Sequence, residues 1–173
     1  AVPIKVIGND LTVSEIDAPS VVGVGTTTTL NFKVTNTGFL PSTSEFWSNG
    51  VYLSTDDVFD ETDTLVGEQF VYHGSEASPL SPSESDDIAI DWLVPDVPSG
   101  TYYLIFVADI NGEEPERVED NNYVVQAIDI GNGPDLTVSD VTVASPLLLG
   151  STVDVSYTIS NVGLATADPV WFE

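Results

Sequence analysis

The chain repeats itself at a fixed offset. The segment Asp10-Leu11-Thr12-Val13-Ser14 returns as Asp135-Leu136-Thr137-Val138-Ser139. When residues 10–48 are laid over residues 135–173 without a gap, 10 of the 39 positions are identical. Self-similarity at a fixed period is typical of modular arrays, in which each repeat is one folding unit.

The repeat also predicts the division of the chain into domains. A unit of about 125 residues can close a hydrophobic core of its own, whereas 39 residues cannot do so without a neighbour. We therefore expect one complete module at residues 1–130, a linker at 131–134, and the N-terminal part of a second, truncated repeat at 135–173. The short linker predicts that adjacent modules lie end to end with limited freedom.

Alternation of apolar and polar residues predicts β-strands throughout the module, and no segment has helical periodicity. The predicted strands lie within residues 11–16, 30–34, 47–53, 65–72, 88–92, 103–107 and 123–127. Seven short strands separated by turns, with no helix between them, favour an antiparallel β-sandwich over a parallel sheet.

The charge of the chain excludes several classes of partner. Twenty-eight acidic residues stand against three basic ones, which gives a formal net charge of −25. Such a chain is repelled by nucleic acid and by anionic membrane surfaces. It contains no apolar run long enough to span a bilayer, so membrane insertion is not expected. Cysteine is absent, so disulfides and thiolate metal sites do not contribute.

The residues required for common catalytic sites are missing. His73 is the only histidine, no Gly-x-Ser-x-Gly motif surrounds a serine, and cysteine is absent. A histidine-based triad or a catalytic zinc centre is therefore not expected, and we predict that the chain is not an enzyme. Trp47, Trp92 and Trp171 occupy positions on apolar strand faces, which favours a role in the core over a ligand platform.

The densest acidic cluster lies between the third and fourth predicted strands. Residues 56–63 include five acids, and calcium takes 6–8 oxygen ligands from carboxylates, carbonyls and water. We predict a calcium site formed by Asp56, Asp60 and Asp63, with Asp57 as a weaker candidate ligand. The spacing is not that of an EF-hand, because Glu61 stands where the glycine belongs. The alternative is an exposed acidic loop in a chain that is acidic everywhere.

A second acidic cluster lies between the sixth and seventh predicted strands. Asp109, Asn111 and Glu113 have the one-three-five spacing of a calcium turn, and they form a weak second candidate site. Glu114 replaces the glycine expected next. We favour a hairpin connection here, with Asn111-Gly112 or Asn121-Asn122 supplying the turn.

The two clusters are expected at opposite ends of the sandwich. In immunoglobulin order the loop after the third strand lies where the chain exits, and the connection between the sixth and seventh strands lies where it enters. Phe59 and Leu65 are expected to anchor the first loop to the core. A cation held there would stiffen the junction between modules, with Asp129 and Asp135 close by.

Several motifs together resemble the CARDB family, the cell-adhesion-related domain of bacteria and archaea. The first repeat has Asp10-Leu11-Thr12-Val13 and, after the second strand, Asn36-Thr37-Gly38. The more specific motifs are Tyr52-Leu53-Ser54-Thr55-Asp56, Gly100-Thr101-Tyr102-Tyr103 and the Asn121-Asn122 ending. The resemblance covers residues 9–130 and, as a truncated copy, 134–173. It implies an immunoglobulin-like seven-stranded sandwich found in tandem in secreted or surface-anchored proteins.

The function that follows is a structural or adhesive module of an extracellular protein or fibre, stiffened by calcium. Its expected partners are neighbouring modules of the same chain or fibre, and a cell-surface protein or a glycan. One alternative is a carbohydrate- or ligand-binding accessory module of a secreted enzyme, which exposed aromatic residues on one face would favour. Another is strand addition by residues 135–173 to the sheet edge of another chain, which would build a filament.

Overall fold

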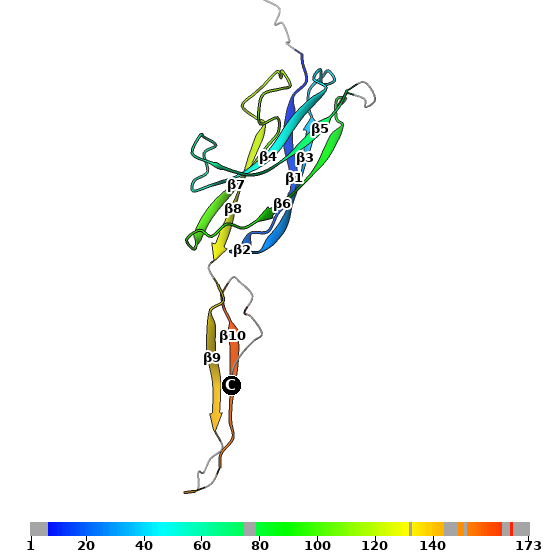
Figure 1. Cartoon of the computed structure of the whole chain (residues 1–173). Helices are drawn as coiled ribbons and strands as arrows, with labels where there is room; N and C mark the ends of the chain where they lie inside the picture. The colour runs from blue at the N-terminus through cyan, green and yellow to red at the C-terminus, as the bar shows by residue number, and fades with distance from the viewer. Residues whose placement is uncertain are drawn as a thin grey trace, which may run out of the picture.

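The chain folds into a β-sandwich followed by a separate β-hairpin (Figure 1). The computed structural model describes residues 7–74, 79–131, 133–143, 149–150, 152–163 and 167. The strands are β1 (Leu11–Asp17), β2 (Val21–Gly23), β3 (Thr27–Asn36), β4 (Phe46–Ser54), β5 (Thr64–Tyr72), β6 (Ser85–Leu93), β7 (Gly100–Val107), β8 (Tyr123–Gly131), β9 (Leu136–Val143) and β10 (Val155–Asn161). No helix occurs among these residues.

Two sheets form the sandwich. One has the order β1-β3-β6, and the other has the order β2-β8-β7-β4-β5. All the pairings are antiparallel except that of β2, which runs parallel to β8. The predicted all-β sandwich is confirmed, and each of the seven predicted strands is present. Strand β2 is an addition, because Val21–Gly23 lies between the first two predicted strands, where no strand was predicted.

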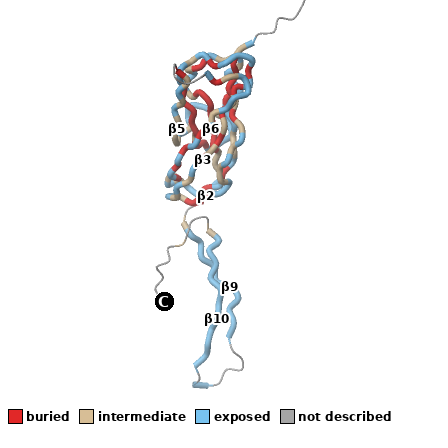
Figure 2. The backbone as a smooth tube through the Cα atoms, turned by 90° about the vertical axis from the view of Figure 1, so that its right-hand side faces the viewer, coloured by how far each residue is buried: buried red, intermediate tan, exposed pale blue. Residues whose placement is uncertain are grey.

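The core lies between the two sheets because apolar residues alternate along the strands. On β3, Leu30, Phe32 and Val34 point inward, and the threonines and Asn31 between them are less buried. The ring of Phe32 meets Phe106 of β7 edge-on, with centroids 5.3 Å apart. Figure 2 shows the buried positions along the inside of the sandwich. The predicted core tryptophans Trp47 and Trp92 are both buried, whereas Trp171 lies outside the described residues.

The chain enters at one end of the sandwich and leaves at the other (Figure 1). We call the end that contains Gly8 and Leu11 the entry end, and the end that contains Gly131 the exit end. The connection between β7 and β8 lies at the entry end, because Arg117 donates its backbone N–H to the carbonyl of Asn9. The position predicted for this connection is therefore confirmed.

Strands β9 and β10 pair in the same register as β1 and β3. Leu11 faces Asn36 in the first pair, and Leu136 faces Asn161 in the second. The Asn36 side chain accepts hydrogen bonds from the backbone of Asp10 and Gly38. Asn161 accepts the corresponding bonds from the backbone of Asp135 and Gly163, which lie 125 positions after Asp10 and Gly38. The second segment therefore forms the same local structure as the first.

The two pairs also share their irregularities. A β-bulge interrupts each ladder, and the residue beside it has a left-handed backbone, with φ of 49° at Glu15 and 52° at Asp140. A non-glycine residue in this conformation is strained, and it persists only where the surrounding structure requires it. The turn that precedes the second strand has a glycine with positive φ in each copy, Gly25 and Gly150.

The two strand pairs differ in how far their residues are buried. In the sandwich, the inward face of β1 and β3 is covered by the second sheet. In the β9–β10 hairpin every described strand residue is exposed, and Figure 2 shows it without a covering layer. The apolar residues of this uncovered face include Val138, Tyr157 and Ile159.

Candidate functional site

The acidic loop between β4 and β5 folds against the outer face of the five-stranded sheet. Phe59 at its tip packs on Tyr52 of β4 and on Tyr123 of β8, with ring centroids 5.0 and 5.5 Å away. Leu65, the second expected anchor, is largely exposed. One of the two predicted anchors therefore holds the loop, and it does so on the sheet surface instead of in the core.

The loop does not lie at the exit end. Strand β4 runs towards that end, as predicted, and stops at Ser54, opposite Tyr103. The loop then turns back, because Phe59 contacts Tyr123, the first residue of β8, at the opposite end of that strand from Gly131. Figure 1 shows it projecting from the side of the sandwich. The prediction that it reaches the junction between modules is wrong.

The three predicted calcium ligands accept hydrogen bonds within their own loop. Asp56 accepts the backbone N–H of Val58 at 2.9 Å, and Asp63 accepts that of Asp60 at 2.9 Å. Asp60 accepts both the N–H and the hydroxyl of Thr62, and these bonds lower its pKa. Such side-chain turns close a loop without a metal ion.

Among the residues that the structure describes, no three acidic or imidazole side chains converge closely enough to hold a metal ion. The predicted ligands Asp56, Asp60 and Asp63 therefore do not converge on one point, and Asp57 is exposed beside them. The carboxylates of the second cluster do not converge in this way either. Calcium binding would require these carboxylates to turn from their backbone partners towards one point.

In the second cluster the predicted ligands hold the β7–β8 connection together. Asp109 accepts the backbone N–H groups of Glu113 and Glu114, each at 2.8 Å. Asn111 donates to Glu113, whose other oxygen accepts the N–H of Ser48 on β4 at 3.0 Å. Gly112 has a φ of 65°, which supports the predicted turn at Asn111-Gly112. Burial raises the pKa of Asp109, although its backbone bonds oppose the shift.

Glu114 is a residue that sequence reasoning missed. Its side chain is completely buried and accepts hydrogen bonds from the Asn9 amide, from the N–H and hydroxyl of Thr43, and from the N–H of Ser44. A buried carboxylate persists only when such donors surround it. It joins the entry segment to the β3–β4 connection. In the sequence it is one of several neighbouring acids, so no local pattern distinguished it.

Glu116 and Arg117 join the same connection to strand β1. Glu116 accepts the N–H of Leu11 and the amide of Asn122, while Arg117 forms an ion pair with the buried Asp10. Burial raises the pKa of Glu116 to about 8, with smaller contributions from the nearby carboxylates of Glu119 and Asp109. We call the β7–β8 connection, residues 108–122, the entry clasp, because it fixes the point at which the chain enters the sandwich.

The single histidine is structural as well. Its ring stacks on Trp47 with centroids 4.5 Å apart, and its Nε2 lies 2.8 Å from a carboxylate oxygen of Asp86. These contacts join the end of β5 to β4 and, across the sandwich, to β6.

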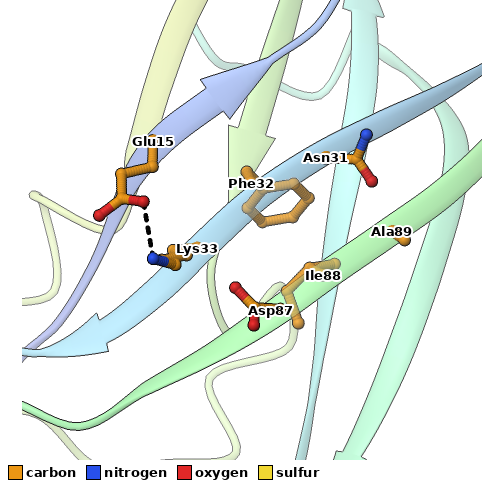
Figure 3. A pocket seen from close by; sticks show the side chains of 7 residues that line it. All are labelled: Glu15, Asn31, Phe32, Lys33, Asp87, Ile88 and Ala89. Carbon is orange, nitrogen blue, oxygen red and sulfur yellow. Dashed lines mark hydrogen bonds and ion pairs between the residues drawn. The ribbon is translucent and has the colours of Figure 1, made fainter.

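A shallow polar pocket lies on the outer face of the three-stranded sheet (Figure 3). Lys33 forms a 2.6 Å ion pair with Glu15, and Asp87 pairs with Lys33 in the strand register. The Glu15 hydrogen bond and charge raise the pKa of Lys33, so the amine stays protonated and is not a nucleophile at neutral pH.

These observations define a β-sandwich module whose polar clusters hold its loops together. The CARDB family model matches residues 8–126. The chain belongs to the CARDB family, a cell-surface-associated and cell-adhesion-related family of domains. A search of curated protein sequences found no matching relative. In the described residues there is no helix of the length and apolarity needed to cross a membrane.

Solved CARDB domains share the fold. The crystal structure of a CARDB domain from Pyrococcus furiosus in complex with di-metal ions is 24% identical, with a TM-score of 0.52, and the match covers 70% of this chain and 88% of that one. A solution structure of the same domain gives 24% identity, a TM-score of 0.51, and coverage of 72% and 97%. A domain of a Methanosarcina acetivorans protein assigned to the cell surface gives 20% identity, a TM-score of 0.52, and coverage of 70% and 91%.

Proposed function

We propose that the chain is a structural and adhesive repeat unit of a secreted or cell-surface protein, and that residues 135–173 belong to a second copy of the same module. The β9–β10 hairpin carries this proposal. It reproduces the register, the bulge, the strained residue and the asparagine hydrogen bonds of β1 and β3 at a constant offset. Independent segments would not share all four features, so a repeated module explains them best.

The rest of the sandwich supports a mechanical role. The entry clasp ties Asn9, Asp10 and Leu11 to the body of the module through four side chains. Force applied along the chain at this end reaches the whole sandwich, because strand β1 cannot leave without breaking these bonds and its pairing with β3. These contacts let the module transmit force along the chain.

A chimera tests the tandem arrangement. Glu173 corresponds to Ser48 in the repeat, so residues 49–131 are joined after Glu173 to supply the remaining strands of a second module. Hydrogen exchange should then protect the amides of β9 and β10, which exchange rapidly in the 173-residue chain because no sheet covers them. A chimera in which these amides exchange at the same rate as before would contradict the proposal.

Calcium stiffening belongs to the proposal as its second part. A related CARDB domain was crystallised in complex with di-metal ions. In this chain Asp56 and Asp63 each have one carboxylate oxygen bonded within the loop, which leaves the second oxygen for a cation. A bound ion would rigidify the loop on the sheet surface and would not act at the junction between modules.

Terbium luminescence tests this part directly. Terbium replaces calcium at oxygen sites, and Tyr52 and Tyr123 lie close enough to the loop, through Phe59, to sensitise it. We expect luminescence that calcium displaces and that Asp60→Asn weakens, with Asp96→Asn as the control in another loop. If Asp60→Asn and Asp96→Asn give equal signals, binding is diffuse and the calcium site is refuted.

The accessory-module alternative depends on aromatic rings that could stack on a sugar. Phe46 and Phe70 are exposed on one face of the sandwich, which favours it. The two rings stack on each other, however, so one face of each is already covered. Binding of the chain to a glycan array would support the alternative, and its absence would leave the repeat unit as the function.

A further inference from the structure

Three aromatic side chains are exposed together on the outer face of the five-stranded sheet, near the entry end. Phe46 of β4 pairs with Tyr72 of β5 in the strand register. Phe70 lies two residues before Tyr72 and stacks on Phe46, with ring centroids 5.4 Å apart and 30° between the planes. Their exposed fractions are 45% for Phe46, 58% for Phe70 and 51% for Tyr72. We call these three residues the aromatic patch.

Carboxylates surround the aromatic patch. Glu45 and Glu113 line a surface pocket of about 270 Å³ together with Phe46 and Ser44. Glu68 is exposed on β5 and shares the outward face with Phe70, two residues further on. The Glu45 carboxylate forms no hydrogen bond or ion pair with another described residue, so its charge is not compensated within this part of the chain.

No lysine or arginine in the described part of the chain neutralises this surface. Lys33 and Arg117 are the only lysine or arginine residues in the described part of the chain, and they are paired with Glu15 and Asp10. An exposed apolar patch with a polar rim is typical of a protein-binding surface. Here both components attract positive charge, because aromatic faces bind cations and carboxylates pair with them.

We propose that the aromatic patch and its carboxylates bind an arginine- or lysine-bearing segment of a different protein. A guanidinium group can stack on the open ring faces while it pairs with Glu45. A second copy of this chain is a poor partner, since it offers three basic residues against 28 acids. An arginine side chain is favoured over a glycan because it can pair with the carboxylates as well as stack on the open ring faces.

The sequence of the second repeat is consistent with a retained aromatic position. Trp171 stands 125 residues after Phe46, so each copy has a large aromatic residue at this point. Phe46 is exposed in the first copy, so its aromatic ring is available to a partner there. The inference deepens the adhesive role proposed above by naming its class of partner.

The test uses a fluorescein-labelled nine-residue peptide, Gly-Ser-Arg repeated three times, and the same peptide with citrulline in place of arginine. Binding to the 173-residue chain is measured by fluorescence anisotropy in about 0.15 M salt, where the Debye length of about 8 Å suppresses long-range attraction. We expect the arginine peptide to bind and the citrulline peptide to bind at least about five-fold more weakly, because citrulline has no charge.

Matched variants locate the binding. We expect Phe70→Ser to weaken binding about five-fold and Glu45→Gln about two-fold. The controls are Leu93→Ser, an exposed apolar residue on β6, and Glu61→Gln, an exposed acid in the β4–β5 loop, which should leave the affinity unchanged. Circular dichroism checks that each variant is folded, and amide chemical shifts of the unmodified chain should move at the aromatic patch.

Four results of these binding experiments would overturn the proposal, and a fifth comes from a glycan array. They are equal binding of the citrulline peptide, unchanged binding by Phe70→Ser, equal loss with Glu61→Gln and Glu45→Gln, and shift changes confined to another surface. Glycan-array binding that Phe70→Ser abolishes would overturn it as well, in favour of a sugar. The chimera experiment measures the protection of the β9 and β10 amides and substitutes none of these residues, so the two proposals can fail separately.

Discussion

The β1–β3 pair and the β9–β10 hairpin have the same local structure in two different environments. Both have the same register, the same bulge and the same asparagine hydrogen bonds. In the first pair the inward apolar side chains are buried under the second sheet, and in the second pair they are exposed. Local sequence therefore specifies the shape of the strand pair, while its stability depends on the covering sheet.

The largest expected contrast lies between Phe32 and Tyr157, which are equivalent positions. Phe32 is buried against Phe106, so Phe32→Ala should lower the free energy of unfolding by about 3–5 kcal/mol through lost burial and a cavity. Tyr157 is exposed, and Tyr157→Ala should change the free energy of unfolding by less than about 0.5 kcal/mol. Urea denaturation monitored by tryptophan fluorescence measures both. Equal losses would show that the hairpin is covered in solution.

The next contrast concerns the two asparagines. Asn36 is completely buried, and its side chain bonds to the backbone of Asp10, Gly38, Leu40 and Leu80. Replacing it with alanine leaves these groups unsatisfied and should cost about 3 kcal/mol.

Asn161→Ala is the matched control, because water can replace its hydrogen bonds at an exposed site. It should change the free energy of unfolding by less than about 1 kcal/mol. Thermal denaturation of the two variants compares their stabilities. A smaller loss of stability for Asn36→Ala than for Asn161→Ala would refute the prediction.

A third contrast depends on pH and on the entry clasp. Glu116 holds β1 and has a pKa of about 8 in the folded chain, against an ordinary value of 4.5. The folded state therefore keeps a proton that the unfolded state releases, and stability falls as the pH rises from about 4.5 to about 8. The groups that face this carboxyl are Leu11 N–H, Asn122, Glu119 and Asp109.

Glu116→Gln should remove most of the pH dependence in this window, because glutamine stays uncharged. Unfolding free energies at pH 5, 6.5 and 8 measure the effect. Glu119→Gln is the control, since Glu119 is exposed and its charge is one of the smaller contributions to the raised pKa of Glu116. If the unfolding free energy of the Glu116→Gln chain depends on pH as steeply as that of the unmodified chain, another group is responsible for the pH dependence.

The smallest effect is expected on the outer face. Lys33 pairs with Glu15, and its equivalent in the second repeat is Thr158. Lys33→Thr makes the first pair resemble the second and should leave the thermal midpoint unchanged, because an exposed ion pair adds little. A clear loss of stability would mean that the strained Glu15 needs this partner.

Much of the fold could be predicted because strand alternation is a local property. The pattern Leu30, Phe32, Val34 identified β3, and similar patterns identified six other strands. Strand β2 was missed, because Val21–Gly23 has no alternation and becomes a strand only by pairing with Asp129–Gly131, more than 100 residues away. The acidic loop was correctly placed in the chain, but its position depends on a contact between Phe59 and Tyr123 that no local pattern shows.

The candidate sites show the same limit. Sequence reasoning treated Asp109, Asn111 and Glu113 as possible ligands, and the structure uses their oxygens and amides inside the entry clasp. Glu114, which is the most buried acid, was not selected. Acid content alone does not distinguish a solvated carboxylate from one surrounded by backbone donors, because the donors come from Thr43 and Ser44, about 70 positions away.

The sequence by itself determined the repeat, the all-β class, the strand faces and the absence of the residues needed for common catalytic centres. Each of these follows from residue identity or from spacing within a few positions. The tertiary structure alone decided which acids are buried, where the acidic loop rests and which aromatic rings reach the surface. These properties depend on contacts between distant segments, whose free energy is set by desolvation and packing once the two sheets meet.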